Sequence, residues 1–167
     1  MKYRVALFIG RFQPFHKGHL YGLKKCLEVG ERVLIGIGSS NVTLTEDNPY
    51  NEDLRRDMIY KVIEKYIDSE KVIDVIGIKD VPNDSEWVRE LEVTIDNLHL
   101  TKDEVVVVSN NEWVTKLLCL AGFPVHETGF FNRDELEGRL IRAMMREGDD
   151  KWKERVSEEV AKLISSC

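Results

Sequence analysis

The stretch YRVALFIGRFQPFHKGH, residues Tyr3–His19, joins an apolar run to a segment rich in glycine, histidine and other polar residues. The apolar run predicts a buried strand over Tyr3–Gly10, and the pattern beyond it predicts a helix over Lys17–Val29. Gly10 permits a tight exit from the strand, and Pro14 delays the start of the helix. This stretch therefore predicts the strand, loop and helix that begin a βαβ unit.

The rest of the chain continues the alternation of strands and helices. Further strands are predicted at Arg32–Gly38, Lys71–Ile78, Glu104–Ser109 and Pro124–Thr128. Helices are predicted at Asn51–Tyr66, Asp84–Leu98 (with Asp84 or Ser85 as its cap), Glu112–Ala121, Asp134–Arg146 and Lys153–Ser165. Strands separated by helices of this length indicate an α/β fold, with a parallel five-stranded sheet and helices on both faces.

Composition limits the class of protein. The chain has 167 residues, 43% of them hydrophobic, which suits one domain with a real core. Its net charge of −6 is a poor match for a nucleic-acid backbone. No apolar run approaches the roughly 18 residues of a membrane helix. Three widely spaced cysteines, Cys26, Cys119 and Cys167, indicate a reducing cytoplasm and no disulfide framework.

In parallel sheets, ligands bind beyond the carboxyl ends of the strands, so the Gly10–His19 loop is the first candidate site. Its backbone N–H groups at a helix start suit an anion, and His16 and His19 could donate hydrogen bonds to phosphate oxygens. The same spacing is also typical of surface or capping histidines. The remaining histidines, His99 and His126, lack zinc-ligand spacing. Neither the dinucleotide fingerprint nor the P-loop is present.

Two later turns carry side chains suited to a planar or polar ligand. Trp87 begins the helix after the third predicted strand, where it could stack on an aromatic ring or simply fill the core. Asn83 precedes that helix and could bond polar groups nearby. Asn110 and Asn111 follow the fourth strand, where their amides could read a base or ribose or cap the next helix.

The ten residues GRFQPFHKGH closely resemble the signature of the archaeal-type nicotinamide-nucleotide adenylyltransferases, a family of the HxGH nucleotidylyltransferase superfamily. Other segments also resemble that family: IGIGSS (Ile35–Ser40), DNPY (Asp47–Tyr50), IKDVPNDSEWV (Ile78–Val88), SNNEWV (Ser109–Val114) and GFFNRDE (Gly129–Glu135). The resemblance implies a Rossmann-like single domain over residues 1–167. Residues 1–130 would form its core, and residues 131–167 would form C-terminal helices carrying a final phosphate-binding motif.

The resemblance also implies an activity: transfer of AMP from ATP to nicotinamide mononucleotide (NMN), giving NAD and pyrophosphate. It implies Mg²⁺ held mainly by substrate phosphates and no protein metal site. The implied partners are ATP, NMN and the product NAD, with neither nucleic acid nor membrane. A cytoplasmic homo-oligomer is implied as well.

Residue roles follow from the same resemblance. The implied catalytic residues are His16, His19, Arg11 and Arg142. The implied ATP-binding residues are Gly10, Arg11, Phe12, Gln13, Phe15, His16, Gly18, His19, Arg139 and Arg142. The implied nucleotide- or nicotinamide-binding residues are Ser39, Arg55, Asn83, Trp87, Asn110 and Asn111.

The chain departs from the family pattern at LEGRLIR, Leu136–Arg142. Glu137 and Arg139 stand where the family has serine and threonine, so a carboxylate replaces a hydroxyl near the expected triphosphate. Arg139 could supply a charge-assisted phosphate contact instead. The departure leaves two alternatives open: an acceptor such as flavin mononucleotide, phosphopantetheine or a polyol phosphate, or a non-catalytic nucleotide sensor.

Overall fold

The computed structural model describes residues 2–129 and 131–167. Met1 and Phe130 lie outside the described residues, so the GFFNRDE run is described only in part. The first half contains β1 (Tyr3–Gly10), α1 (Lys17–Val29), β2 (Gly30–Ile37), α2 (Glu52–Tyr66), η1 (Ser69–Lys71) and β3 (Val72–Gly77). The second half contains α3 (Asp84–Asn97), η2 (Lys102–Glu104), β4 (Val105–Val108), α4 (Glu112–Leu120), β5 (Val125–His126), α5 (Gly138–Arg146), η3 (Asp150–Arg155) and α6 (Glu158–Ser165).

The strands form one sheet in the order β3-β2-β1-β4-β5, and every pairing is parallel. The register places Leu7 beside Leu34 on one side and beside Val107 on the other. The chain builds outward from β1 to β3 and then returns to the opposite side of β1. Strand order therefore reverses between β1 and β4, which is where an open parallel sheet binds its ligands.

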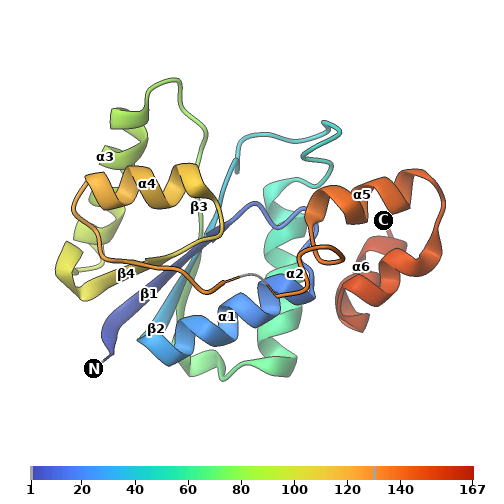
Figure 1. Cartoon of the computed structure of the whole chain (residues 1–167), viewed down its shortest axis with the longest axis horizontal. Coiled ribbons are helices and arrows are strands. Elements are labelled where there is room, and N and C mark those ends of the chain that lie inside the picture. Colours follow the sequence, from blue (N-terminus) through green and yellow to red (C-terminus); the bar gives the residue numbers. More distant parts are fainter. Residues whose placement is uncertain (1, 130) are drawn as a thin grey trace.

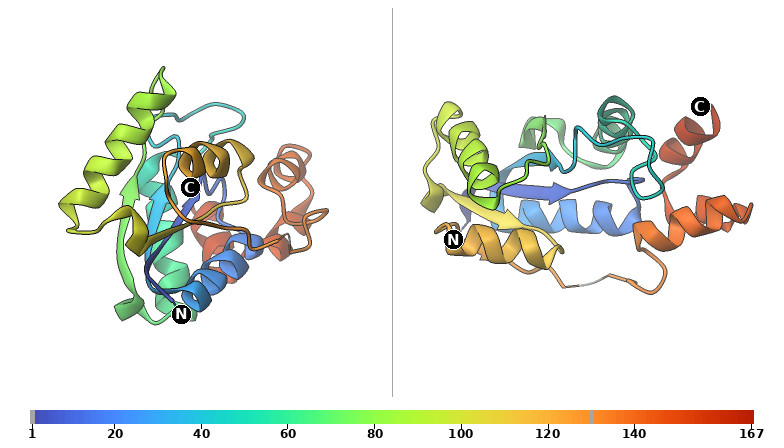
Figure 2. Two further views of the ribbon diagram at one scale, coloured as in Figure 1. Left: turned by 60° about the vertical axis from the view of Figure 1, so that its left-hand side comes forward. Right: turned by 90° about the horizontal axis from the view of Figure 1, so that it is seen from above.

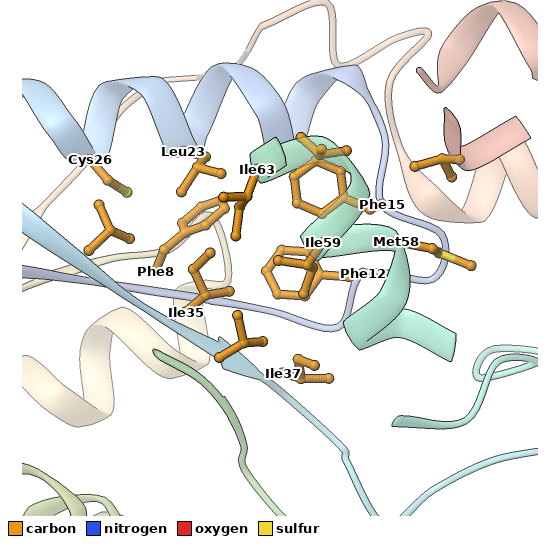
Figure 3. Packing of buried hydrophobic residues seen from close by; sticks show 14 of the residues in the cluster. Phe8, Phe12, Phe15, Leu23, Cys26, Ile35, Ile37, Met58, Ile59 and Ile63 are labelled. Atoms are coloured by element: carbon orange, nitrogen blue, oxygen red, sulfur yellow. The ribbon is translucent and has the colours of Figure 1, made fainter. Parts of the chain in front are cut away.

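Alternate side chains of the sheet fill two separate cores, as the period of two along a strand requires. Ala6 and Phe8 of β1 point into the core beneath α1, α2, α5 and α6, whereas Leu7 and Ile9 point into the core beneath α3 and α4. Figure 3 shows the first core, in which Phe8 lies among side chains from α1 and α2. The predicted α/β sheet with helices on both faces is confirmed.

The C-terminal helices α5 and α6 lie together beyond the carboxyl end of the sheet (Figures 1 and 2). Ile141 of α5 and Val160 of α6 are both buried in the first core. This placement brings the start of α5 to the edge of the sheet where ligands bind. In the part of the chain that the structure describes, no helix is long and apolar enough to span a membrane.

Two predicted helices are wrong in their bounds. The helix predicted from Asp134 begins only at Gly138, because the preceding residues form a turn in which the Asn132 carbonyl accepts from the Glu135 N–H. The helix predicted over Lys153–Ser165 is instead two elements, η3 and α6. Ser157 separates them, since its extended backbone ends η3 and its side chain caps α6.

Candidate active site

Two adjoining pockets lie at the carboxyl ends of the strands. The first has a volume of about 320 Å³ and the second about 310 Å³. They share one wall, formed by Ile9, Gly10, Arg11, Ser109 and Asn111. This wall is the exit of β1 facing the exit of β4, so both pockets open at the point where strand order reverses.

His16 and His19 line the first pocket and form the start of α1. His16 Nδ1 accepts hydrogen bonds from the backbone N–H groups of Gly18, at 3.1 Å, and His19, at 3.4 Å. His19 Nδ1 accepts from the His16 N–H at 3.2 Å. The rings are stacked with their centroids 3.6 Å apart. The two histidines therefore form a reciprocal capping box, with imidazoles in place of the usual hydroxyl and carboxylate.

This geometry fixes the protonation of both rings. Because each Nδ1 accepts a hydrogen bond, the proton of each neutral imidazole must lie on Nε2. Burial, and to a lesser extent the positive charge of Arg142, lowers the pKa of His16 to about 3. Burial, followed by repulsion from His16 in its protonated form, holds the pKa of His19 well below its usual value. Both imidazoles are therefore neutral Nε2–H donors at neutral pH.

The depressed pKa of His16 predicts a pH-dependent stability. The unfolded state binds the proton between pH 6.5 and about 3 while the folded state does not, so stability is lost as pH falls below 6.5. His16→Asn removes the titration but retains a capping side chain. Urea unfolding at pH 7, 6 and 5 should show the wild type losing about 1 kcal/mol more per pH unit than the variant below pH 6. Equal slopes for the two proteins would contradict the assignment.

Phe12 and Phe15 do not line either pocket, so an ATP contact here would involve the backbone around Gln13–Phe15 and not these two rings. Both rings are buried in the first core, between α1 and α2 (Figure 3). Their centroids lie 4.9 Å and 5.3 Å from that of His19. The two phenylalanine rings therefore pack against His19 from the side of the first core.

Gly18 is needed because of the His16 ring. A Cβ on Gly18 would lie 2.9 Å from His16 Cε1 and 3.0 Å from His16 Nδ1. Gly18→Ala should therefore displace the ring and lower kcat/KM at least about tenfold, since small misplacements of catalytic groups are costly. Alanine favours a helix by about 1 kcal/mol over glycine, so stability should change little. Steady-state kinetics and thermal melts test this, and an unchanged kcat/KM would contradict it.

Arg55, which the resemblance implied to bind the nucleotide or nicotinamide, lines neither pocket. Its side chain is fully buried on the inner side of α2, against the loops that follow β1 and β2. Its Nη1 donates to the carbonyls of Arg11, at 2.9 Å, and Gly38, at 2.8 Å, and its Nη2 donates to that of Ser39 at 3.0 Å. Arg55 thus joins the exits of β1 and β2, which position Arg11 and Ser39 in the pockets.

Gln13 and Arg142 also tie loops together. The Gln13 amide donates to the Tyr50 carbonyl at 2.8 Å and accepts from the Tyr50 N–H at 3.0 Å. Arg142 is 5% exposed; its Nη1 donates to the Gln13 carbonyl at 2.9 Å and its Nη2 pairs with Asp47 at 3.2 Å. Its buried Nε has no hydrogen-bond partner. Neither side chain is among the described residues that line the two pockets.

The start of α5 reaches the first pocket through Glu137 and Gly138. Glu137 is the N-cap residue, but its side chain accepts no capping hydrogen bond. The first N–H groups of α5 therefore keep their capacity to bind an anion. Arg139 is instead 68% exposed on its side chain, where its Nε lies 3.5 Å from the Glu137 carboxylate. It lies outside both pockets.

The second pocket is lined by Trp87 and Trp113, whose rings meet edge to face at 5.0 Å. Trp87 is buried in the second core beneath α3, and Trp113 is 45% exposed. Ser39 lines the same pocket in a left-handed conformation, with φ of 49°. Sequence analysis did not single out Trp113, although its place two residues after Asn111 brings it to the same edge of the sheet.

The three predicted asparagines differ in whether they cap a helix, line a pocket or do both. Asn83 caps α3 by accepting from the N–H groups of Ser85 and Glu86, so neither Asp84 nor Ser85 is the cap, and Asn83 does not line either pocket. Asn111 caps α4 and also lines both pockets. Asn110 lines the first pocket, and its Oδ1 accepts from the Thr128 hydroxyl at 3.2 Å.

An aromatic pair that sequence analysis missed also lines the first pocket. The rings of Tyr21 and Phe131 are stacked, with centroids 4.6 Å apart and an interplanar angle of 12°. Tyr21 stands on α1 three residues after Gly18, which lines the same pocket, so helical spacing was a signal that could have found it. Phe131 comes from the segment before α5, and only the fold brings the two rings together.

Comparisons with known proteins agree with this geometry. The model of the cytidylyltransferase-like family matches residues 7–127. A nicotinamide-nucleotide adenylyltransferase of Ignicoccus hospitalis is 37% identical over 95% of this chain and 90% of its own length. The one from Archaeoglobus fulgidus is 34% identical over 95% of this chain and 89% of its own length.

Solved structures share the fold. A bifunctional NMN adenylyltransferase/ADP ribose pyrophosphatase from Francisella tularensis, complexed with AMP and a manganese ion, superposes with a TM-score of 0.77 at 21% identity. The match covers 98% of this chain and 52% of that one, so this chain spans about half the length of that protein. A nicotinic acid mononucleotide adenylyltransferase from Plasmodium falciparum superposes with a TM-score of 0.62 at 11% identity, over 98% and 95% of the two chains.

The matches extend from β1 to the C-terminal helices, so they include the histidine pair, both pockets and α5. The chain therefore belongs to the cytidylyltransferase-like family and, within it, to the archaeal-type nicotinamide-nucleotide adenylyltransferases.

Proposed function

We propose that this protein transfers AMP from ATP to NMN, giving NAD and pyrophosphate. The observation that carries the proposal is the pair of adjoining pockets with one shared wall. The first presents two neutral Nε2–H donors and the start of a helix, which suit a triphosphate. The second presents two tryptophans, which suit a planar pyridine ring.

The reaction follows from placing one substrate in each pocket. A phosphate oxygen of NMN attacks the α-phosphorus of ATP, and the bond from that phosphorus to the oxygen bridging the β-phosphate breaks. Pyrophosphate leaves with the electron pair, so the protein supplies no nucleophile. Catalysis then rests on positioning and charge stabilisation. Arg11 stands on the shared wall, where the two phosphates meet.

His16 and His19 donate their Nε2–H groups to the triphosphate as negative charge moves onto the leaving pyrophosphate. Neutral donors suit this task because they need no proton from solvent and remain donors throughout turnover. Arg142 adds positive potential next to His16 and fixes the Gln13 loop. In this proposal the core over residues 1–130 holds both substrates, and residues 131–167 complete the phosphate site through the start of α5.

A divalent cation fits this site only through the substrate. Among the described residues, no group of three or more His, Cys, Asp or Glu side chains could hold a metal ion. Glu137, which lines the phosphate pocket, is paired with Arg139, and Asp47 is paired with Arg142. Mg²⁺ would therefore be bound by phosphate oxygens and water, where it neutralises triphosphate charge.

The test is an assay with purified protein, ATP, Mg²⁺ and a panel of acceptors, in which pyrophosphate release and the adenylylated product are followed. The panel contains NMN, flavin mononucleotide, phosphopantetheine and a polyol phosphate. NAD formation is the expected result. Turnover with another acceptor only, or ATP binding without turnover on any acceptor, would contradict the proposal and support a different transferase or a nucleotide sensor.

The proposal also includes the cellular compartment and the oligomeric state of the enzyme. The exposed thiols of Cys119 and Cys167 suit the reducing cytoplasm. Val93 and Leu120 are large apolar residues exposed on α3 and α4, and they suit a contact between copies in a homo-oligomer. Light scattering coupled to size-exclusion chromatography measures the assembly.

A further inference from the structure

The second pocket carries one feature that the proposed reaction does not use, the side chain of Asp80. The described residues that line this pocket include two charged side chains, Arg11 and Asp80; the others are apolar, aromatic or neutral polar. Asp80 follows β3, at the same edge of the sheet as Trp87. Asp80 is an exposed residue, so burial does not oppose its charge, and a ligand in this pocket would meet a negative charge.

The charged side chains of Arg11 and Asp80 line different parts of the two pockets. Arg11 lines both pockets, since it stands on their shared wall beyond β1. On the proposed reaction, that is where the phosphates of the two substrates meet, so phosphate engages the Arg11 charge. Asp80 lines the second pocket and not the first. The charge left facing the ring end of the second pocket is therefore negative.

Asp80 is held in place by its backbone. The Asn41 amide donates to the Asp80 carbonyl at 3.1 Å and accepts from the Asp80 N–H at 2.8 Å. The Ser40 N–H also donates to the Ile78 carbonyl at 3.0 Å. These bonds join the loops after β2 and β3 beyond the last paired residues. The backbone of Asp80, a residue that lines the pocket, is thus fixed beside Ser39.

We propose that Asp80 sets the selectivity of the acceptor pocket, favouring a pyridine ring with an uncharged carboxamide over one with a carboxylate. The inference rests on the proposed function and deepens it. A carboxamide N–H₂ can donate to the Asp80 carboxylate, whereas a ring carboxylate meets a like charge in a partly enclosed pocket. A neutral pocket would treat both rings alike, and the same fold includes a protein named for the acid form.

The experiment compares kcat/KM for NMN and for nicotinic acid mononucleotide in the wild type, Asp80→Asn and the control Glu86→Gln. Glu86 lies in the first turn of α3 and lines neither pocket. The wild type should prefer NMN by about tenfold or more, the order of effect of a like-charge clash. Asp80→Asn should reduce that ratio at least about fivefold, chiefly by faster turnover of the acid, and Glu86→Gln should leave it unchanged.

Thermal melts with and without ATP show that each variant folds, and Asp80→Ser replaces Asp80→Asn if the asparagine variant does not. A ratio that stays within twofold of the wild type in the folded variant overturns the inference, as does a wild type that uses both acceptors equally. A wild type that turns over neither acceptor contradicts the proposed function itself, so the two failures are distinguishable. A purely structural role of Asp80 would lower both activities together and leave their ratio unchanged.

Discussion

His19→Ala should lower kcat for NAD formation by about two to three orders of magnitude, the usual cost of removing one preorganised donor to developing charge. The variant loses an Nε2–H that the capping box aims at the first pocket. It also frees the His16 N–H and removes a ring that contacts Phe12 and Phe15, so the free energy of unfolding should fall by about 1–3 kcal/mol. Steady-state kinetics below the melting temperature separate the two effects.

The control for this experiment is His99→Asn, because His99 lies outside both pockets and has a positive φ that asparagine tolerates. It should retain wild-type kcat. KM for NMN should change little in His19→Ala, since the histidine pair lines the first pocket and not the second. A His19→Ala protein with near wild-type kcat would remove the histidine pair from the proposed mechanism.

The largest effect on stability is expected for Arg55→Met, which should lower the free energy of unfolding by about 3–5 kcal/mol. Methionine fills much of the space but leaves the carbonyls of Arg11 and Gly38 without their Arg55 donor, whereas the Ser39 carbonyl still accepts from the Val42 N–H. Each unsatisfied buried carbonyl costs about 1–3 kcal/mol. Urea unfolding followed by circular dichroism measures the loss.

Two further variants test this explanation. Arg55→Lys keeps the charge but not the planar fork, so its loss should fall between those of the wild type and Arg55→Met. Lys61→Met removes an exposed cation on the same helix, whose distance to Glu64 is 3.8 Å, and should change stability by less than about 1 kcal/mol. If Arg55→Met and Lys61→Met lost similar stability, the loop-joining role of Arg55 would be wrong.

Sequence patterns predicted the sheet well because the deciding interactions are local. The helix predicted at Lys17–Val29 has the observed bounds, and the strand predicted at Glu104–Ser109 contains β4. A strand of consecutive valines is typical of a parallel sheet covered on both faces, which is where β4 lies. The ten-residue signature likewise located the histidine pair at the end of β1.

Sequence patterns failed to predict the start of α5, because contacts with a segment remote in sequence decide where that helix begins. A run of charged and apolar residues from Asp134 reads as helix, yet the chain turns at Asn132 and α5 begins only at Gly138. The start at Gly138 places it against Arg142 and the Gln13 carbonyl, with no room for a Cβ. The contacts of Gly138 and Arg142 with Gln13 cross more than a hundred residues of chain, so no local period encodes them.

The sequence by itself therefore determined the order of the elements, the parallel sheet and the position of His16 and His19 between β1 and α1. Only the tertiary structure decided which polar groups face the pockets and which support them from behind. Arg55 and Gln13 looked like ligand contacts, but they satisfy backbone groups of loops that are remote in sequence. The reason is physical: a buried polar side chain must find its hydrogen-bond partners wherever the fold brings them, and sequence spacing does not record that place.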